Sequence, residues 1–145
     1  MIKIINPQTP AEWETYFSIR YTTLRSEWGQ PAGSEHLADD DVSFHALAYD
    51  ESGLAIGVCR LHFNNPQEGQ IRMMGVVQGI RTQGVGRALM HYFEDFARQK
   101  DANKMVLDAR ESAVRFYEKL GYTKVEGKTH VLWGLIPHFW MEKEL

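Results

Sequence analysis

Residues 76–89 read Val-Val-Gln-Gly-Ile-Arg-Thr-Gln-Gly-Val-Gly-Arg-Ala-Leu, and this stretch decides the fold. An apolar strand ends, a polar turn with glycines follows, and an amphipathic helix begins. The first turn of a helix has amides without partners and a partial positive charge, so it favours an anion such as a phosphate. Gly84 and Gly86 keep side chains away from such a ligand, and Arg81 and Arg87 add positive charge. The stretch predicts a phosphate-binding turn; a glycine-rich turn without a ligand is the alternative.

Two other kinds of glycine-rich loop do not fit these residues. A P-loop requires Gly-Lys-Ser/Thr after its second glycine, whereas Gly84 is followed by Val85 and Gly86. A dinucleotide-binding fingerprint that starts at Gly84 requires a third glycine at position 89, which is Leu89. Both nucleotide-binding interpretations are therefore excluded.

The helices and strands on either side of the turn are predicted from hydrophobic periodicity and from the positions of capping and turn residues. Thr9 and Glu12 form a capping box, with proline at the first helical position, so a helix is expected from residue 10 to about residue 25. Further helices are expected at 84–100 and 112–120. Strands are expected at 2–5, 42–49, 54–63, 70–77, 105–109, 122–125 and 138–142. With no repeat or linker, residues 1–145 are expected to form a single domain, a mixed sheet with helices on its faces.

A second motif follows about twenty residues after the first. Residues 107–122 read Leu-Asp-Ala-Arg-Glu-Ser-Ala-Val-Arg-Phe-Tyr-Glu-Lys-Leu-Gly-Tyr. Together the two segments closely resemble the Gcn5-related N-acetyltransferase (GNAT) superfamily. Residues 81–86 match its pyrophosphate motif, Arg/Gln-x-x-Gly-x-Gly/Ala, and residues 116–122 match its later aromatic-Tyr-x-x-x-Gly-aromatic run. The resemblance is specific over residues 70–122 and rests on element order elsewhere.

The resemblance implies a particular α/β fold. It is a mixed, mostly antiparallel sheet of six to seven strands with helices on both faces. A bulge in the strand at 70–77 splays it from the strand at 104–109, and the gap admits the pantetheine arm of an acyl-CoA. The implied acyl donor is acetyl-CoA, and no metal is implied.

The resemblance also assigns residues to the donor site. Val76 and Val77 would bind pantetheine through their main chains, and an amide near Val76 would polarise the thioester carbonyl. The amides of residues 83–88 would hold the pyrophosphate. The implied cofactor-binding residues are Val76, Val77, Arg81, Gln83, Gly84, Val85, Gly86, Arg87, Ala88, Ser112 and Phe116.

The implied chemistry is direct attack of an amine on the thioester, without a covalent enzyme intermediate. Tyr117 matches the family tyrosine that protonates the departing thiolate; a packed core aromatic is the alternative. Asp108 is a candidate for relaying the proton of the amine, although residues at strand ends are often merely hydrogen-bonded. These two residues are the predicted catalytic groups.

The general base is less clear. Many relatives carry a glutamate on the strand that here reads Arg-Met-Met-Gly at 72–75, and this departure puts a direct carboxylate base in doubt. Four residues are reserve candidates for the base: Glu35, His36, His130 and His138. Without a base, the chain would be a non-catalytic acyl-CoA-binding sensor or scaffold, which is the second hypothesis.

In this family the acceptor is bound largely by segments that here correspond to 21–37 and 127–139. Their aromatic residues are expected either to wall a pocket or to form core or a dimer interface: Trp28, Trp133, Phe139 and Trp140. A set of arginines either pairs with an acidic acceptor or is solvated: Arg20, Arg25, Arg72 and Arg110. The expected acceptor is a primary amine of a small molecule or peptide, which the sequence does not name.

Composition narrows the remaining classes. The formal net charge of −3 offers no basic field for nucleic acid, so no nucleic-acid partner is expected. The single cysteine, Cys59, excludes an internal disulfide and lies in an apolar run, where we expect a reduced core residue. No apolar window approaches the roughly 18 residues of a membrane span, so a cytoplasmic protein without membrane contacts is expected. A homodimer is allowed but not required.

Overall fold

The structure is a computed structural model that describes residues 1–79 and 83–145. The chain divides into two compact units. The N-terminal unit comprises residues 1–62 and 73–93, and the C-terminal unit comprises residues 63–72 and 94–145.

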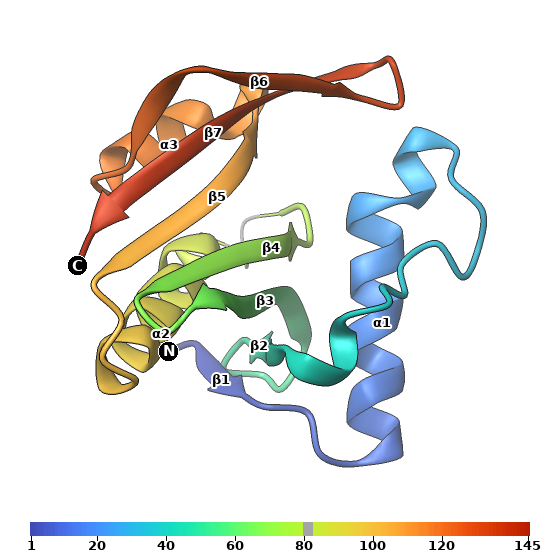
Figure 1. Ribbon diagram of the computed structural model, residues 1–145. Helices are drawn as coiled ribbons and strands as arrows, with labels where there is room; N and C mark the ends of the chain where they lie inside the picture. The colour runs from blue at the N-terminus through green and yellow to red at the C-terminus, as the bar shows by residue number, and fades with distance from the viewer. Residues whose placement is uncertain (80–82) are drawn as a thin grey trace. The chain divides into compact units, whose positions relative to one another are not determined.

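The described residues form a seven-stranded sheet with the order β1-β2-β3-β4-β5-β7-β6 (Figure 1). The pairs β1–β2, β2–β3, β5–β7 and β6–β7 are antiparallel, and β4–β5 is parallel. The strands are β1 (Lys3–Ile5), β2 (Phe44–Tyr49), β3 (Ala55–Asn65), β4 (Glu68–Val76), β5 (Lys104–Arg110), β6 (Thr123–Leu132) and β7 (Ile136–Glu144). The helices are α1 (Pro10–Leu24), α2 (Val85–Gln99) and α3 (Val114–Lys119), with short 3₁₀ turns at Ser26–Trp28, Asp40–Val42 and Glu111–Ala113.

The capping box of α1 is present as predicted. The Thr9 hydroxyl accepts from the amide of Glu12 at 3.1 Å, and the Glu12 carboxylate accepts from the amide of Thr9 at 3.1 Å. The helix then buries one face against β2 and β3, in a core cluster of Tyr16, Ile19, Leu47 and Val58. The cap sets where α1 begins, and the aromatic face sets how it lies on the sheet.

Adjacent residues of β3 show that helices cover both faces of the sheet in the N-terminal unit. Val58 belongs to the cluster packed against α1. A Cβ added at Gly57 would lie 2.7 Å from Cγ1 of Val85 and 3.3 Å from Cδ1 of Leu89, both on α2. Because successive residues of a strand face opposite sides, α1 and α2 cover opposite faces. This confirms the predicted mixed α/β fold.

The strand β4 carries the predicted irregularity. Its register with β5 runs from Glu68–Lys104 to Ile71–Leu107. Two residues further on, Met73 has a φ of 56°, a left-handed conformation that is uncommon for a residue with a side chain. The recorded parallel pairs therefore end at Ile71, just before this left-handed residue; the expected splay of β4 from β5 stays a prediction.

The hairpin of the C-terminal unit is longer than the sequence predicted. Strands were expected only at 122–125 and 138–142, whereas β6 extends to Leu132 and β7 begins at Ile136. Nearly every residue of β6 is exposed, so it shows none of the alternation by which a half-buried strand is recognised. The expected boundaries were therefore too short.

A buried charged group packs the end of α2 in the C-terminal unit. Glu94 is 1% exposed, accepts a hydrogen bond of 2.8 Å from the Tyr122 hydroxyl, and pairs with the Lys143 ammonium at 3.2 Å. Paired in this way, the carboxylate is tolerated inside the unit. Within the part of the chain that the structure describes, no helix is both long and apolar enough to cross a membrane.

Candidate active site

The predicted donor-binding residues of the N-terminal unit lie at the start of α2. The amide of Ala88 donates to the carbonyl of Gly84 at 2.9 Å, which is the first bond of the helix. The Ala88 amide is therefore used inside the helix, and helix geometry leaves the preceding amides, up to Arg87, without intrahelical partners. Gly84 has a φ of 79° and open space where a Cβ would lie. Arg81 lies outside the described residues.

The start of α2 packs against β3 at Gly57. Val85 is completely buried while its neighbours Gln83, Gly84 and Arg87 are exposed. The contact is tight because Gly57 has no side chain; a Cβ there would lie 2.7 Å from Val85. This contact fixes the start of the helix on β3, and helix geometry leaves its first amides available to an anion.

The end of β4 has one amide already in use. The Val77 amide donates to the carbonyl of Ile56 on β3 at 2.9 Å. Since the backbone groups of successive strand residues point to opposite edges, the amide and carbonyl of Val76 point away from β3. Of the two valines, Val76 is the better placed to bind a ligand at that edge.

Four arginines were candidates for binding an acidic acceptor, and one of them, Arg20, is not available. Arg20 is 0% exposed, and its Nη1 donates to Asp40 at 2.9 Å and to the carbonyl of Glu35 at 3.0 Å. Arg60, also 0% exposed, donates to Asp39 at 2.6 Å and to Asp40 at 3.0 Å. These groups fix the segment after α1 to the core and are structural.

The arginine cluster, defined as Arg20, Arg60, Asp39, Asp40, Tyr16 and His45, also orients a histidine. His45 Nε2 lies 2.9 Å from the carbonyl oxygen of Asp40, which can only accept, so Nε2 carries the proton. His45 Nδ1 then accepts from the Tyr16 hydroxyl at 2.7 Å, and that hydroxyl accepts from Arg20 at 2.8 Å. Burial lowers the pKa of His45, which keeps the ring neutral between the two arginines.

The two other titratable groups of this region are equally inert. Burial acts to raise the pKa of Asp40, but the amide of Leu37 and the guanidinium of Arg20 outweigh it, and the pKa lies below its ordinary value. Cys59 is 0% exposed, and burial raises the pKa of its thiol to about 12. The expectation of a core cysteine is confirmed, since no thiolate forms there at neutral pH.

The predicted catalytic residues belong to the C-terminal unit. Tyr117 lies on α3, is 6% exposed, and contacts the rings of Phe116 and Tyr122 at centroid distances of 5.0 and 5.9 Å. Ser112, in the 3₁₀ turn before α3, and Phe116 are both exposed. Asp108 lies on β5, with its side chain 34% exposed. The structure thus gives Tyr117 a packed ring and Asp108 an accessible carboxylate.

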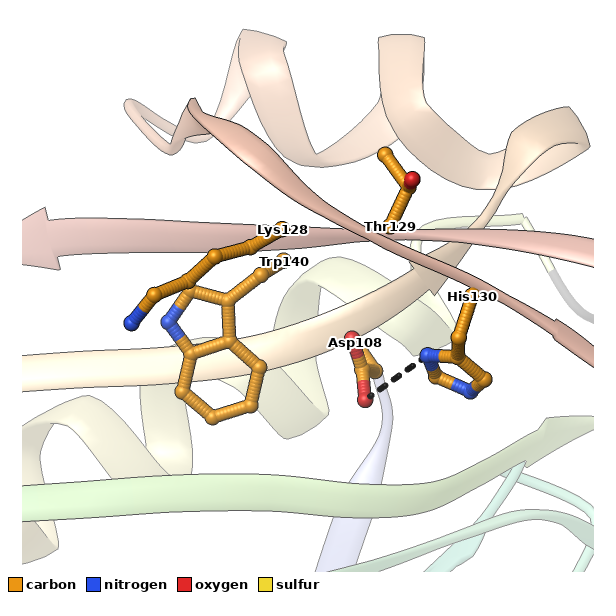
Figure 2. A pocket seen from close by; sticks show the side chains of 5 residues that line it. All are labelled: Asp108, Lys128, Thr129, His130 and Trp140. Atoms are coloured by element: carbon orange, nitrogen blue, oxygen red, sulfur yellow. Dashed lines mark ion pairs between the residues drawn. The ribbon is translucent and has the colours of Figure 1, made fainter.

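A small cavity opens beside Asp108 (Figure 2). It measures about 270 Å³ and is lined by Asp108, Lys128, Thr129, His130 and Trp140. Asp108 is the register partner of Trp140, so the two side chains share one face of the sheet. His130 Nδ1 lies 3.8 Å from Asp108 Oδ2, and the Lys128 ammonium lies 5.7 Å from the Trp140 ring centroid.

The reserve candidates for the base separate into two groups. Glu35 accepts from the amide of Gly33 at 2.8 Å, and His36 packs on Phe17 with ring centroids 4.2 Å apart. Those contacts belong to the N-terminal unit. In the C-terminal unit His138 is buried, and its ring stacks on that of His130 with centroids 4.9 Å apart. Among these four candidates, His130 is the one with a recorded contact to a predicted catalytic group, Asp108.

Sequence reasoning did not name Lys128 or the convergence of its neighbours. Asp108, His130 and Trp140 were each considered, but in separate roles. The missing signal was strand register. The β5–β7 register brings Trp140 opposite Asp108, and the β6–β7 register brings His130 opposite His138. Among the described residues, no three His, Cys, Asp or Glu side chains gather as a metal site.

Comparison with known proteins identifies the class to which this chain belongs. Residues 1–122 match the acetyltransferase (GNAT) family. An uncharacterized N-acetyltransferase of Bacillus subtilis, YjcF, is 28% identical over 99% of this chain and 100% of its own length.

Solved structures give the same result. The crystal structure of a putative N-acetyltransferase from Lactobacillus plantarum has a TM-score of 0.84 at 26% identity, covering 99% of this chain and 98% of that one. An aminoglycoside 6′-N-acetyltransferase complexed with coenzyme A shares the fold, with a TM-score of 0.79 at 16% identity and coverage of 99% and 96%. The chain belongs to the GNAT family, and it is an acyltransferase of that family.

Proposed function

We propose that this chain transfers the acetyl group of acetyl-CoA to a primary amine of a small molecule or peptide, in the cytoplasm. The observation that carries the proposal is the start of α2, where the Ala88 amide makes the first bond of the helix to Gly84, so that helix geometry leaves the preceding amides without intrahelical partners. An aminoglycoside acetyltransferase of the same fold holds coenzyme A. A helix terminus of this kind binds phosphate groups through its amides and its partial charge.

The donor site takes its other groups from the end of β4. The Val76 amide points away from β3 and is the candidate for polarising the thioester carbonyl. The amides from Gln83 to Arg87 hold the pyrophosphate, with Arg81 and Arg87 adding charge. Ser112 and Phe116 are the proposed contacts from the region of α3. Ala88 contributes through the helix dipole, because its own amide is already bonded to Gly84.

The reaction is the direct attack of a neutral amine on the thioester carbonyl. The amine nitrogen forms the new bond to carbon, the carbon–sulfur bond breaks, and the surplus proton on nitrogen leaves through Asp108 to water. The Tyr117 hydroxyl gives its proton to the departing thiolate and regains one from solvent. Positioned proton donors of this kind contribute about 10²- to 10⁴-fold to rate.

The donor site is tested by the substitution Gly84→Asp. Aspartate tolerates a left-handed conformation better than most residues, and no atom of the described residues lies within 4 Å of the position of the new Cβ, so the fold is expected to survive. The new carboxylate opposes phosphate at the same place. We expect the affinity for acetyl-CoA, measured by thermal shift and calorimetry, to fall by about 10- to 100-fold.

Gly134→Asp is the matched control, since Gly134 has a φ of 66° and equally open space but lies between β6 and β7. Its affinity for acetyl-CoA should equal that of the parent. Unchanged acetyl-CoA affinity in a folded Gly84→Asp variant would remove the phosphate site from the proposal.

The alternative, a non-catalytic acyl-CoA-binding sensor or scaffold, is separated by Tyr117→Phe. In an enzyme, this change lowers kcat by about 10²- to 10⁴-fold while acetyl-CoA still binds. A protein that binds acetyl-CoA but acetylates no amine, with or without Tyr117, would be the sensor. Steady-state release of the thiol across a panel of amines provides the measurement.

A further inference from the structure

The cavity beside Asp108 owes its existence to an irregularity in β6. Lys124 pairs with Met141, and the next recorded pair is Thr129 with Phe139. Between these pairs β6 has residues 125–128, whereas β7 has only Trp140. A bulge of this size arches away from its partner strand. Gly127, with a φ of 81°, supplies the left-handed residue that the arch needs.

At the arch, β6 does not pair regularly with Trp140, and Lys128 lies over the indole ring instead. The Lys128 ammonium lies 5.7 Å from the ring centroid, within the range of a cation–π interaction. Figure 2 shows the extended Lys128 side chain lying alongside the indole. The chain itself thus demonstrates that an unbranched alkylammonium fits at this face.

The opposite wall of the cavity is anionic. Asp108 shares the sheet face with Trp140, and among the described residues its recorded charged partner is His130, at 3.8 Å. That distance is longer than a hydrogen bond, so the carboxylate has accepting capacity left. An aromatic face beside a half-exposed carboxylate suits an ammonium group.

The size of the cavity narrows the ligand further. Binding pockets for drug-sized ligands usually measure about 300–1,000 Å³, and this one, at about 270 Å³, lies below that range. A small amine such as a linear alkyl amine fits a cavity of this size.

We infer that Trp140 and Asp108 form the acceptor subsite, that it selects unbranched alkyl primary amines such as linear diamines or a lysine side chain, and that Lys128 occupies it until the acceptor binds. This inference rests on the proposed function. Lys128 therefore acts as an internal competitor, and Trp140 sets specificity.

The test compares substitutions along β6. Lys128→Met removes the competitor and keeps the alkyl bulk, so the KM for 1,4-diaminobutane, with acetyl-CoA saturating, should fall by about 2- to 5-fold with kcat unchanged. Lys124→Met is the matched control. Lys124 lies on the same strand with its ammonium 5.0 Å from the Phe139 ring centroid, outside the cavity lining, and its removal should leave KM unchanged.

Substitutions at Trp140 test the other member. Because Trp binds cations better than Phe, and Leu lacks a ring, the KM for 1,4-diaminobutane should rise from Trp140 to Trp140→Phe to Trp140→Leu, by about 5- to 30-fold in total. Butan-1-ol, which has no charge, should not compete. An unaltered KM for 1,4-diaminobutane in Lys128→Met would overturn the inference. So would a Lys128→Met variant whose KM rises only for acidic amines such as glutamate.

A direct binding measurement separates this inference from the proposed function. The protein has four tryptophans, and Trp140→Phe identifies the indole N–H signal of Trp140 in a ¹H–¹⁵N spectrum. A shift of that signal on addition of 1,4-diaminobutane supports the subsite even if no amine is acetylated, in which case only the proposed function fails. No shift at millimolar diamine, with other amines being acetylated, overturns the subsite alone.

Discussion

Two regions of the molecule carry nearly the same kinds of residue and treat them in opposite ways. The arginine cluster buries Arg20 and Arg60 completely and joins them to Asp39 and Asp40. The cavity beside Asp108 leaves that carboxylate 34% exposed and His130 49% exposed, 3.8 Å apart. In the first region the charged groups pair with one another. In the second region the carboxylate and the imidazole remain accessible to a ligand. Burial and the number of partners, rather than residue type, separate a structural charge from a functional one.

The largest effect expected from this contrast is on stability in the arginine cluster. Arg20→Met removes the guanidinium that pairs with Asp40 Oδ2 and donates to the Tyr16 hydroxyl, leaving the Leu37 amide as a donor to Oδ2, and breaking a buried pair from one side costs about 3–5 kcal/mol. Urea unfolding measures this loss. Arg98→Met, which removes an exposed i,i+3 pair with Asp95, should cost under about 0.5 kcal/mol. A loss below about 1 kcal/mol for Arg20→Met would mean that the cluster is not structural.

The second largest effect is expected on the activity of the enzyme when Asp108, in the cavity, is changed. Asp108→Asn should reduce kcat/KM about 10²-fold, because the amide neither accepts the proton of the amine nor attracts its charge. The free energy of unfolding should change by less than about 0.5 kcal/mol, since Asp108 is an accessible residue. Asp95→Asn is the control for both readouts. If the loss of activity were matched by a loss of stability, the contrast between the two regions would not hold.

The smallest effect is a pH dependence of stability. The pKa of His45 is lowered in the folded state, so below about pH 6.5 the unfolded chain binds the proton that the folded chain refuses, and stability falls as pH falls. The lowered pKa of Asp40 adds a further loss below about pH 4, as that carboxylate is protonated. One histidine contributes at most about 1.4 kcal/mol per pH unit.

Urea unfolding from pH 7 to pH 4.5 measures this slope. His45→Asn should flatten it, although the variant will be less stable at every pH. A slope that His45→Asn leaves intact would assign the effect to other groups.

Much of the fold could be predicted because its decisive residues act locally. The capping box at Thr9 and Glu12, the glycine turn before α2 and the run ending at Tyr122 all depend on neighbours within a few positions. The bulge in the strand at 70–77 was expected from the family resemblance, and in this strand the structure has a left-handed residue, Met73.

The parts that were not predicted depend on distant partners. Nothing near Arg20 in the sequence indicates that Asp40 will neutralise it, so that arginine was considered for acceptor binding. The length of β6 was missed because an exposed edge strand has no apolar alternation. The meeting of Asp108, Trp140 and His130 follows from strand register, which a single sequence does not reveal.

The arch in β6 has a consequence for how the chain can be altered. Residues 125–128 stand where a regular ladder would have one residue, so the length of this segment is adjustable without disturbing the pairs on either side, Lys124–Met141 and Thr129–Phe139. The contact between α2 and β3, by contrast, depends on Gly57, because an added Cβ there would lie 2.7 Å from Cγ1 of Val85. If the proposed acceptor subsite is correct, we expect libraries that vary the length of the arch to change acceptor preference while leaving acetyl-CoA binding as it is.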